Sequence, residues 1–217
     1  TGGLTDAMSA MLTDEVAAQL PGMQLRIIKA FSNDIIKLLG SEQIDLGLTF
    51  EVHAPVGFTS TALLSERLCY LSQRTDDSGP ITFAEVLSHP LTLPASPSSV
   101  REAVEEAARE TGAEIDGGFD LNSIQTAKDL ASCGLSGTIL PYGAVHDCAD
   151  SDEIGIRLVV SPMIERTLYL VRHRHRSKIE IERDLCRILD HTLTNFVRQN
   201  SAAQQFWRIP GEDAPAL

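Results

Sequence analysis

Two hydrophobic periods alternate along this chain, and the alternation restricts its possible folds more than any other feature of the sequence. Residues 5–20 carry apolar side chains at helical spacing and end at a proline–glycine pair. Residues 23–27 then alternate as a strand does, residues 34–39 predict a short helix, and residues 44–48 alternate again. Strands separated by helices pair in parallel through crossovers, because parallel neighbours cannot be joined by a tight hairpin. We therefore predict an α/β fold.

A second α/β unit is expected after the turn-forming cluster at residues 76–80. The same alternation of periods recurs there, which indicates two similar subdomains. The expected helices cover residues 82–87, 100–111 and 124–133, and the expected strands cover residues 91–93, 115–121 and 137–140.

Two connections between the subdomains follow from the remaining pattern. The β-prone stretch 58–72, interrupted near residues 65–67, leads from the first subdomain to the second. Strands at 154–160 and 164–172 lead back, and an apolar stripe makes residues 178–198 a long amphipathic helix.

The predicted fold class is therefore α/β, with two Rossmann-like subdomains joined by two crossover strands. Subdomain I is assigned residues 1–65 and 164–198, subdomain II residues 66–163, and residues 199–217 are expected to form a tail.

Composition excludes several functions. Eighteen Lys and Arg against thirty Asp and Glu give a net charge of −12, which repels nucleic-acid phosphates. No apolar run reaches the roughly 18 residues of a membrane helix, so no membrane partner is expected. Four widely spaced cysteines without a CxxC pair favour a reduced, cytoplasmic protein over a disulfide framework, although a redox pair of Cys133 with Cys148 is conceivable.

Several short pieces resemble the effector-binding domain of LysR-type transcriptional regulators. The resemblance covers about residues 3–198 and rests on the order and spacing of the pieces rather than on any one of them. They are Pro21-Gly22 before Leu25-Arg26-Ile27, Phe31-Ser32, Ile44-Asp45-Leu46-Gly47-Leu48, His89-Pro90-Leu91, Leu93-Pro94, and Gly134 followed by Thr138-Ile139-Leu140-Pro141.

The resemblance implies a fold like that of type II periplasmic binding proteins, with a small-molecule effector bound in a cleft between the subdomains. It also implies a homodimer or homotetramer. DNA would be bound only through an N-terminal winged helix-turn-helix, which this sequence lacks.

The sequence departs from the family pattern at two places. The family opens its first subdomain with a strand just before the position of Gly2-Gly3, and that strand is missing or cut short here, which suggests truncation. Ser136 stands where the family more often has glycine.

Hydroxyl-bearing residues precede the expected helices, where backbone amides and the helix dipole favour anions. In open α/β sheets these helix N-termini lie at the carboxyl ends of the strands, where ligands bind. The candidate effector-binding residues in these stretches are Gly3, Leu4, Thr5, Ser32, Ser96, Ser98 and Ser99. Capping is the alternative for each hydroxyl, although Ser32 matches an effector-contact position of the family.

A second set of candidates lies after the strands at 115–121 and 44–48. Phe119, Asn122 and Ser123 fall where the family places further effector contacts, and Thr49 follows the other strand. A core role for Phe119 and capping by Asn122 and Ser123 remain equally possible. Arg101 is the one arginine in these stretches, so the sequence shows no bidentate clamp. A small anion or carboxylate held by helix N-termini, amides and hydroxyls is therefore expected.

The sequence predicts no enzyme, catalytic residue, cofactor or metal site. Ser136 lacks the Gly-x-Ser-x-Gly spacing of a hydrolase, and phosphate-loop, dinucleotide and HExxH motifs are absent. His173 and His175 alternate, but three interleaved arginines would repel a metal cation. Two other functions remain open: a periplasmic solute-binding protein of a transporter, and a dimerisation module with a vestigial cleft.

Overall fold

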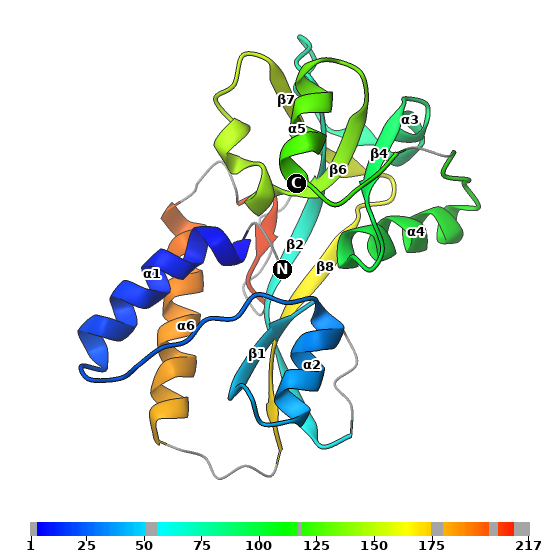
Figure 1. Cartoon of the computed structure of the whole chain (residues 1–217). Coiled ribbons are helices and arrows are strands. Elements are labelled where there is room, and N and C mark those ends of the chain that lie inside the picture. Colours follow the sequence, from blue (N-terminus) through cyan, green and yellow to red (C-terminus); the bar gives the residue numbers. More distant parts are fainter. Residues whose placement is uncertain (1–3, 51–55, 117–118, 175–179, 200–203, 211–217) are drawn as a thin grey trace. The chain divides into compact units, whose positions relative to one another are not determined.

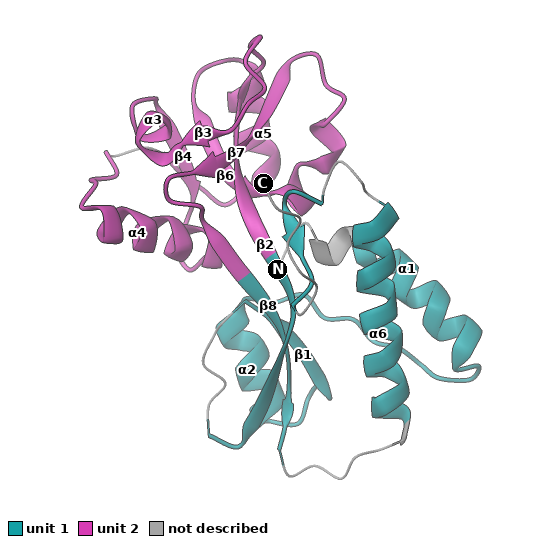
Figure 2. Ribbon diagram, turned by 180° about the vertical axis from the view of Figure 1, so that it is seen from behind, with its two compact units in different colours: residues 1–65, 167–217 teal, residues 66–166 magenta. Residues whose placement is uncertain are grey.

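The computed structural model describes residues 4–50, 56–116, 119–174, 180–199 and 204–210 (Figure 1). The chain divides into two compact units (Figure 2). Unit 1 comprises residues 1–65 and 167–217, and unit 2 comprises residues 66–166. The chain therefore passes between the units twice.

The described residues of unit 1 form a small sheet and three helices. The strand order is β1-β8-β2, in which β1 and β8 are antiparallel and Leu48 faces Leu170. Helices α1 and α6 pack against each other, and α2 packs on β1. The elements are α1 (Leu4–Gln19), α2 (Ser32–Gly40), β1 (Leu46–Thr49), α6 (Glu180–Gln199) and β9 (Trp207–Arg208), with parts of β2 (Phe58–Gln73) and β8 (Glu165–His173).

A close helix–strand contact organises unit 1. Ile35 and Leu39 of α2 pack with Val171 of β8 in a buried apolar cluster. A Cβ atom on Gly47 would lie 2.6 Å from Cγ2 of Ile35, so β1 approaches α2 more closely than any side chain at this position would permit. The spacing of apolar residues in 34–39 thus buries one face of α2, as its pattern predicts.

Two expectations for unit 1 differ from the structure. Residues 23–27, expected to form a strand, are not part of any sheet in the described part of the chain, and Ile27 is exposed. Alternation predicts which side chains share a face, but a strand also needs a neighbour to pair with. The expectation of a tail at residues 199–217 is wrong at Phe206 and Trp207, which are buried, and β9 pairs with β2.

Unit 2 has a mixed sheet, in which β2 is antiparallel to β6 and β7. Its strand order is β2-β6-β4-β5, with β4 parallel to both β6 and β5, while β7 pairs with β2 and β3. The elements are β3 (Ile81–Thr82), α3 (Phe83–Leu87), β4 (Leu91–Pro94), α4 (Ser99–Thr111), β5 (Asp120–Leu121), α5 (Ile124–Ser132), β6 (Gly137–Pro141) and β7 (Ile154–Val160), with two 3-10 helices at Tyr142–Ala144 and His146–Cys148.

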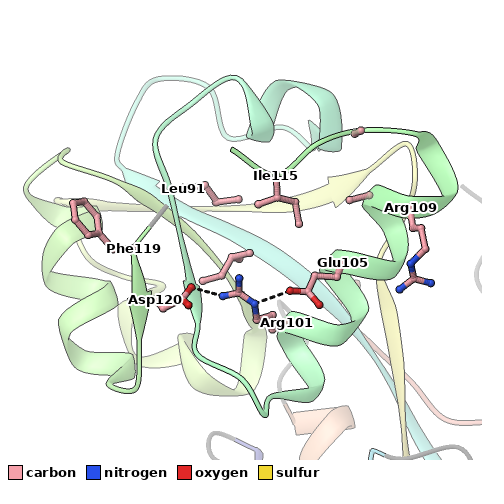
Figure 3. A pocket seen from close by; sticks show the side chains of 10 residues that line it. Leu91, Arg101, Glu105, Arg109, Ile115, Phe119 and Asp120 are labelled. Carbon is pink, nitrogen blue, oxygen red and sulfur yellow. Dashed lines mark hydrogen bonds and ion pairs between the residues drawn. The ribbon is translucent and has the colours of Figure 1, made fainter. Parts of the chain in front are cut away.

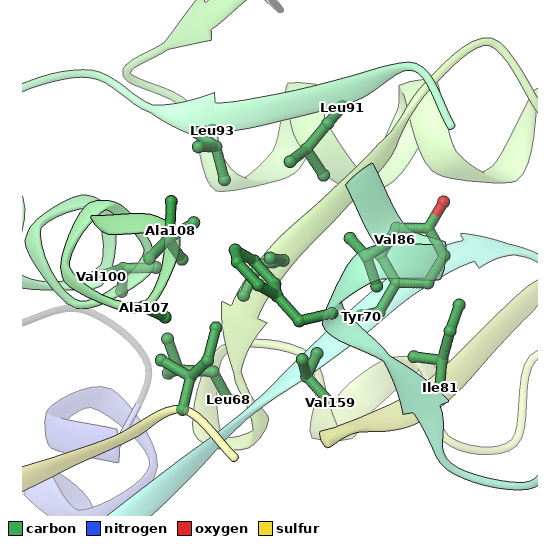
Figure 4. Close-up of a cluster of buried hydrophobic side chains, with 14 residues drawn as sticks. Leu68, Tyr70, Ile81, Val86, Leu91, Leu93, Val100, Ala107, Ala108 and Val159 are labelled. Carbon is green, nitrogen blue, oxygen red and sulfur yellow. The ribbon is translucent and has the colours of Figure 1, made fainter. Parts of the chain in front are cut away.

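One apolar cluster forms the core of unit 2 (Figure 4). Helix α4 contributes Val100, Ala107 and Ala108, which lie on one face of the helix as its period predicts. Figure 4 shows these side chains directed toward Leu93 of β4 and Leu68 of β2. Burial of this face is what holds α4 on the sheet.

Two strands of unit 2 differ from expectation. The predicted interruption of the strand near residues 65–67 is wrong, because β2 continues without a break from Phe58 to Gln73. Its polar residues at 65–67 face polar residues of β8 at 165–167. Of the strand predicted at 115–121, residues 117–118 lie outside the described residues, and Asp120 and Leu121 alone among the described ones belong to a strand.

We predict that Gly137→Ala destabilises the protein. A Cβ atom at Gly137 would clash with the Tyr70 hydroxyl oxygen, and Tyr70 is itself buried in the core. Overpacking of this kind costs about 1–3 kcal/mol of unfolding free energy. The control is Gly155→Ala in strand β7, where the nearest atom would be 3.4 Å away. Equal unfolding free energies of the two variants in urea would contradict this prediction.

Candidate functional site

The carboxyl ends of two parallel strands bring most of the predicted hydroxyl residues of unit 2 to one edge of its sheet. Strands β4 and β5 pair with Leu93 opposite Asp120 and Pro94 opposite Leu121. The Ala95 amide then donates to the Leu121 carbonyl at 2.9 Å, which holds the two following loops together. Ser96 and Ser98 lie between β4 and α4, and Ser99 is the first residue of α4. Asn122 and Ser123 lie between β5 and α5.

The two helix N-termini at this edge differ in their capping. Ser123 is the N-cap of α5, and its hydroxyl accepts a hydrogen bond from the Thr126 amide at 3.2 Å. Ser98 is the N-cap of α4, but its side chain makes no capping hydrogen bond. No N-cap side chain therefore satisfies the first-turn amides of α4, and the helix dipole makes this end favourable for an anion.

A buried ion pair lies beside the start of α4. The Arg166 guanidinium donates from Nη1 to the Ser99 hydroxyl at 2.8 Å, and from Nε and Nη2 to Oε2 of Glu66 at 3.0 and 2.8 Å. The Arg166 and Glu66 side chains are only 8% and 0% exposed. Neither residue is among the candidates predicted from the sequence. The sequence does contain a pattern that indicates this ion pair, because Ser-Glu-Arg at 65–67 and Glu-Arg-Thr at 165–167 are complementary in an antiparallel pair.

Arg101 is engaged by carboxylates of unit 2. Its Nε donates to Glu105 at 2.7 Å, and its Nη1 donates to Asp120. These hydrogen bonds raise the pKa of Arg101 above its usual value. Arg101 thus fastens the first turns of α4 to β5.

Phe119 lines a different part of unit 2 from the serines. Its side chain is 73% exposed and lies at one end of a cavity of about 510 Å³, with Arg109 at the other end (Figure 3). Leu91, Leu93 and Ile115 provide apolar lining, and none of the predicted hydroxyl residues takes part. The structure therefore does not group Phe119 with the serines, and a buried core role is also wrong.

The candidates of unit 1 are dispersed over three elements. Ser32 is the first residue of α2 and is half-buried, and no side chain caps this helix. Thr49 ends β1 and is buried. Leu4 and Thr5 begin α1, and Gly3 lies outside the described residues.

The histidines and cysteines considered in the sequence lie at separate places in the described part of the chain. It holds no group of three His, Cys, Asp or Glu able to bind a metal ion. The His173 ring packs edge-on against the Phe58 ring, with 5.1 Å between the ring centroids. His175 lies outside the described residues. Cys133 is exposed and Cys148 is buried, and both are free thiols. Burial raises the pKa of Cys148.

A family model for the LysR substrate binding domain matches residues 10–193. The chain belongs to this family. This LysR substrate-binding domain is 21% identical over 184 residues to the HTH-type transcriptional regulator BbuR of Bordetella bronchiseptica, covering 82% of this chain and 57% of the relative. It is 24% identical over 159 residues to a probable nitrogen assimilation transcriptional activator of Synechococcus elongatus, covering 70% and 52%. The chain thus spans about half the length of these curated relatives.

Solved structures share the fold of this LysR substrate-binding domain. An H2O2-bound mutant of OxyR from Corynebacterium glutamicum superposes with a TM-score of 0.81 at 15% identity, covering 99% of this chain and 68% of that one. The CcmR regulatory domain of Synechocystis in complex with 2-PG gives 0.74 at 15% identity, covering 89% and 93%. The predicted type II periplasmic-binding-protein-like fold is confirmed. No described helix of the domain has the length and apolarity to span a membrane.

We predict that the two N-cap serines of this LysR substrate-binding domain differ in their contribution to stability. Ser123→Ala removes a capping hydrogen bond and should lower the unfolding free energy by about 1 kcal/mol. Ser98→Ala removes no such bond and should cost clearly less. Urea unfolding of both variants measures the difference. An equal loss would show that Ser98 also acts as a cap.

We also predict a loss of stability in acid through Asp147. Burial acts to raise the pKa of Asp147, but the hydrogen bond and charge of Lys128, 2.6 Å away, outweigh it and lower this pKa. A lowered folded-state pKa stabilises the protein above the ordinary Asp pKa of about 3.9, and this stabilisation is lost as the pH falls below it. Stability measured from pH 6 to pH 2 should fall less in Asp147→Asn than in the wild type. Parallel curves would contradict this assignment.

Proposed function

We propose that this chain is the ligand-sensing domain of a LysR-type transcriptional regulator and binds a small anionic effector. In this proposal the anion lies against the first turn of α4, with α5 beginning beside it. The observation that carries the proposal is the contrast between the capped N-terminus of α5 and the N-terminus of α4, which Ser98 leaves without a side-chain cap. Such a helix end, exposed at the carboxyl edge of a parallel sheet, suits an oxyanion.

The proposed contacts in unit 2 are Ser96, Ser98, Ser99, Asn122 and Ser123. Hydroxyls and amides around one helix N-terminus can donate several hydrogen bonds to the oxygens of a single carboxylate, sulfate or phosphate. The proposal keeps Gly3, Leu4, Thr5, Ser32, Thr49 and Phe119 as further contacts on the strength of the family resemblance alone. The same resemblance is the reason to propose that the effector lies between the two units.

The regulatory role is proposed for the whole protein. Both curated relatives are named as transcriptional regulators, and each is nearly twice as long as the matched region. We propose that DNA binding resides in a part of the full-length protein outside this chain, that the protein acts as a homodimer or homotetramer in the cytoplasm, and that it is not an enzyme. The family match favours this role over that of a transporter's solute-binding protein.

The ligand class is supported by the chemistry of the site and by one neighbour. The Synechocystis CcmR regulatory domain was solved in complex with 2-PG, so the shared fold can hold a small ligand. In this chain, Arg101 is already engaged by Glu105 and Asp120. Binding through amides and hydroxyls therefore fits better than an arginine clamp from α4.

We predict that small anions stabilise the protein against heat, whereas neutral analogues do not. The panel is sulfate, phosphate, acetate, oxalate and 2-PG at constant ionic strength, with acetamide as the neutral control. A ligand at a hundred times its Kd adds about 2.7 kcal/mol of stability. Binding of only neutral or cationic compounds would overturn the proposal.

Two serine substitutions test whether the anion binds at the first turn of α4. Ser98→Ala should weaken the Kd of the best anion about tenfold, since a hydrogen bond to a charged group contributes about 1.5–3 kcal/mol. Ser60→Ala, an exposed serine on the unit 1 part of β2, should leave the Kd unchanged. Equal affinities of wild type and Ser98→Ala in calorimetric titration would place the anion elsewhere.

A further inference from the structure

Three polar pairs join the two strands at the place where the chain passes between the units. Ser65 faces Thr167, Glu66 faces Arg166 and Arg67 faces Glu165, and the Leu68 amide donates to the Ile164 carbonyl at 2.9 Å. The pairs are therefore successive steps of one antiparallel register. The boundaries between the units fall between residues 65 and 66 and between residues 166 and 167. Glu66 and Arg166 are thus the terminal residues of unit 2 on both strands.

The Glu66–Arg166 pair is far more buried than the Arg67–Glu165 pair. Glu66 and Arg166 are 0% and 8% exposed, whereas Arg67 and Glu165 are 19% and 33% exposed. Successive side chains of a strand point to opposite faces, so the two ion pairs lie on opposite faces of the same two strands. A buried ion pair is a weak source of stability, because desolvation offsets the attraction between its charges. Its position therefore calls for an explanation other than stability.

Arg166 also holds the start of a helix. Its Nη1 donates to the hydroxyl of Ser99, which is the first residue of α4. Nε and Nη2 of the same guanidinium donate to Oε2 of Glu66. One planar side chain thus connects the first turn of α4 with both crossover strands.

We propose that the contacts among Ser99, Arg166 and Glu66 couple the first turn of α4 to the crossover strands, and that Glu66 sets the affinity for an anion bound at that turn. The guanidinium is shared between an acidic partner on the strand and a hydroxyl on the helix. An anion at the helix N-terminus attracts the same guanidinium and competes with Glu66 for it. Occupancy of the turn thereby loosens the ion pair between the strands.

The part of this inference that concerns an anion rests on the proposed function. The coupling between helix and strands does not, since all three side chains are in contact without a ligand. Ligand-free and ligand-bound measurements therefore test the two parts separately.

Hydrogen exchange of the ligand-free chain tests the coupling in both directions. Arg166→Met should accelerate exchange of the Glu102 amide, which donates to Ser98 in the first turn of α4, about tenfold. The control Arg67→Met removes the ion pair of the opposite face and should leave this amide unchanged. In the other direction, Ser99→Ala should accelerate exchange of the Leu68 amide, while Ser98→Ala should not.

The outcomes separate coupling from a structural role. Should Arg166→Met fail to fold, the comparison of Ser99→Ala with Ser98→Ala decides the question alone. Equal exchange at Leu68 in the two serine variants, or equal exchange at Glu102 in Arg166→Met and Arg67→Met, would overturn the coupling.

Sulfate titration tests the role of Glu66. Glu66→Gln keeps the shape of the side chain but removes the charge that competes for Arg166, so the Kd for sulfate should fall about tenfold. A site that Glu66 merely supports would be weakened by this substitution, so an unchanged or higher Kd would overturn its affinity-setting role. If sulfate binds neither protein, this role fails together with the proposed function, whereas the exchange result for the coupling stands.

Discussion

The pairing of β2 with β8 is the constraint on which the rest of the architecture depends. The chain passes between its two units only along these strands, so each unit is assembled on one half of the same pair. In unit 2 the β2 half places β6 and, through it, β4, whose parallel pairing sets where α4 and α5 begin. In unit 1 the β8 half pairs with β1 and contributes Val171 to the cluster under α2. Polar side chains at the passage point keep this pairing in register, because each faces a complementary side chain on the other strand.

The sequence predicts those elements whose apolar face meets one neighbouring layer. Helices α2, α4 and α5 follow their hydrophobic period, and strands β4, β6 and β7 follow their apolar runs. Prediction fails at residues 23–27, where alternation is present but the described sheet offers no pairing, and within 115–121, where Asp120 and Leu121 alone among the described residues form a strand. It also fails at Glu66, because a charge within an apolar strand is compatible with the fold only once its distant partner Arg166 is in place.

In the candidate site, the positions of the serines can be predicted from the local sequence, but their hydrogen-bond partners cannot. That Ser98 and Ser123 both precede helices is visible in the sequence, since hydroxyls favour N-cap positions. That one of them caps its helix and the other does not depends on backbone geometry after the strand ends. The contact of Ser99 with Arg166 spans 67 positions of the chain. No local pattern carries such a contact, and the complementary triplets at 65–67 and 165–167 indicate only the pairing of the two strands.

The proposed anion site in unit 2 would lie in a region of repulsive net charge. Residues 66–166 carry 17 acidic and 7 basic side chains, a net charge of −10. Salt screens interactions between exposed charges beyond about 8 Å at physiological ionic strength, so most of this charge acts only weakly on a ligand at the α4 N-terminus. Backbone amides, the helix dipole and the guanidinium of Arg166 act at hydrogen-bond distance, where screening is slight. Glu66 is a fully buried acidic group that shares the Arg166 guanidinium with Ser99. In the proposed site, the affinity for an anion is therefore set by this buried carboxylate rather than by the net charge of the unit.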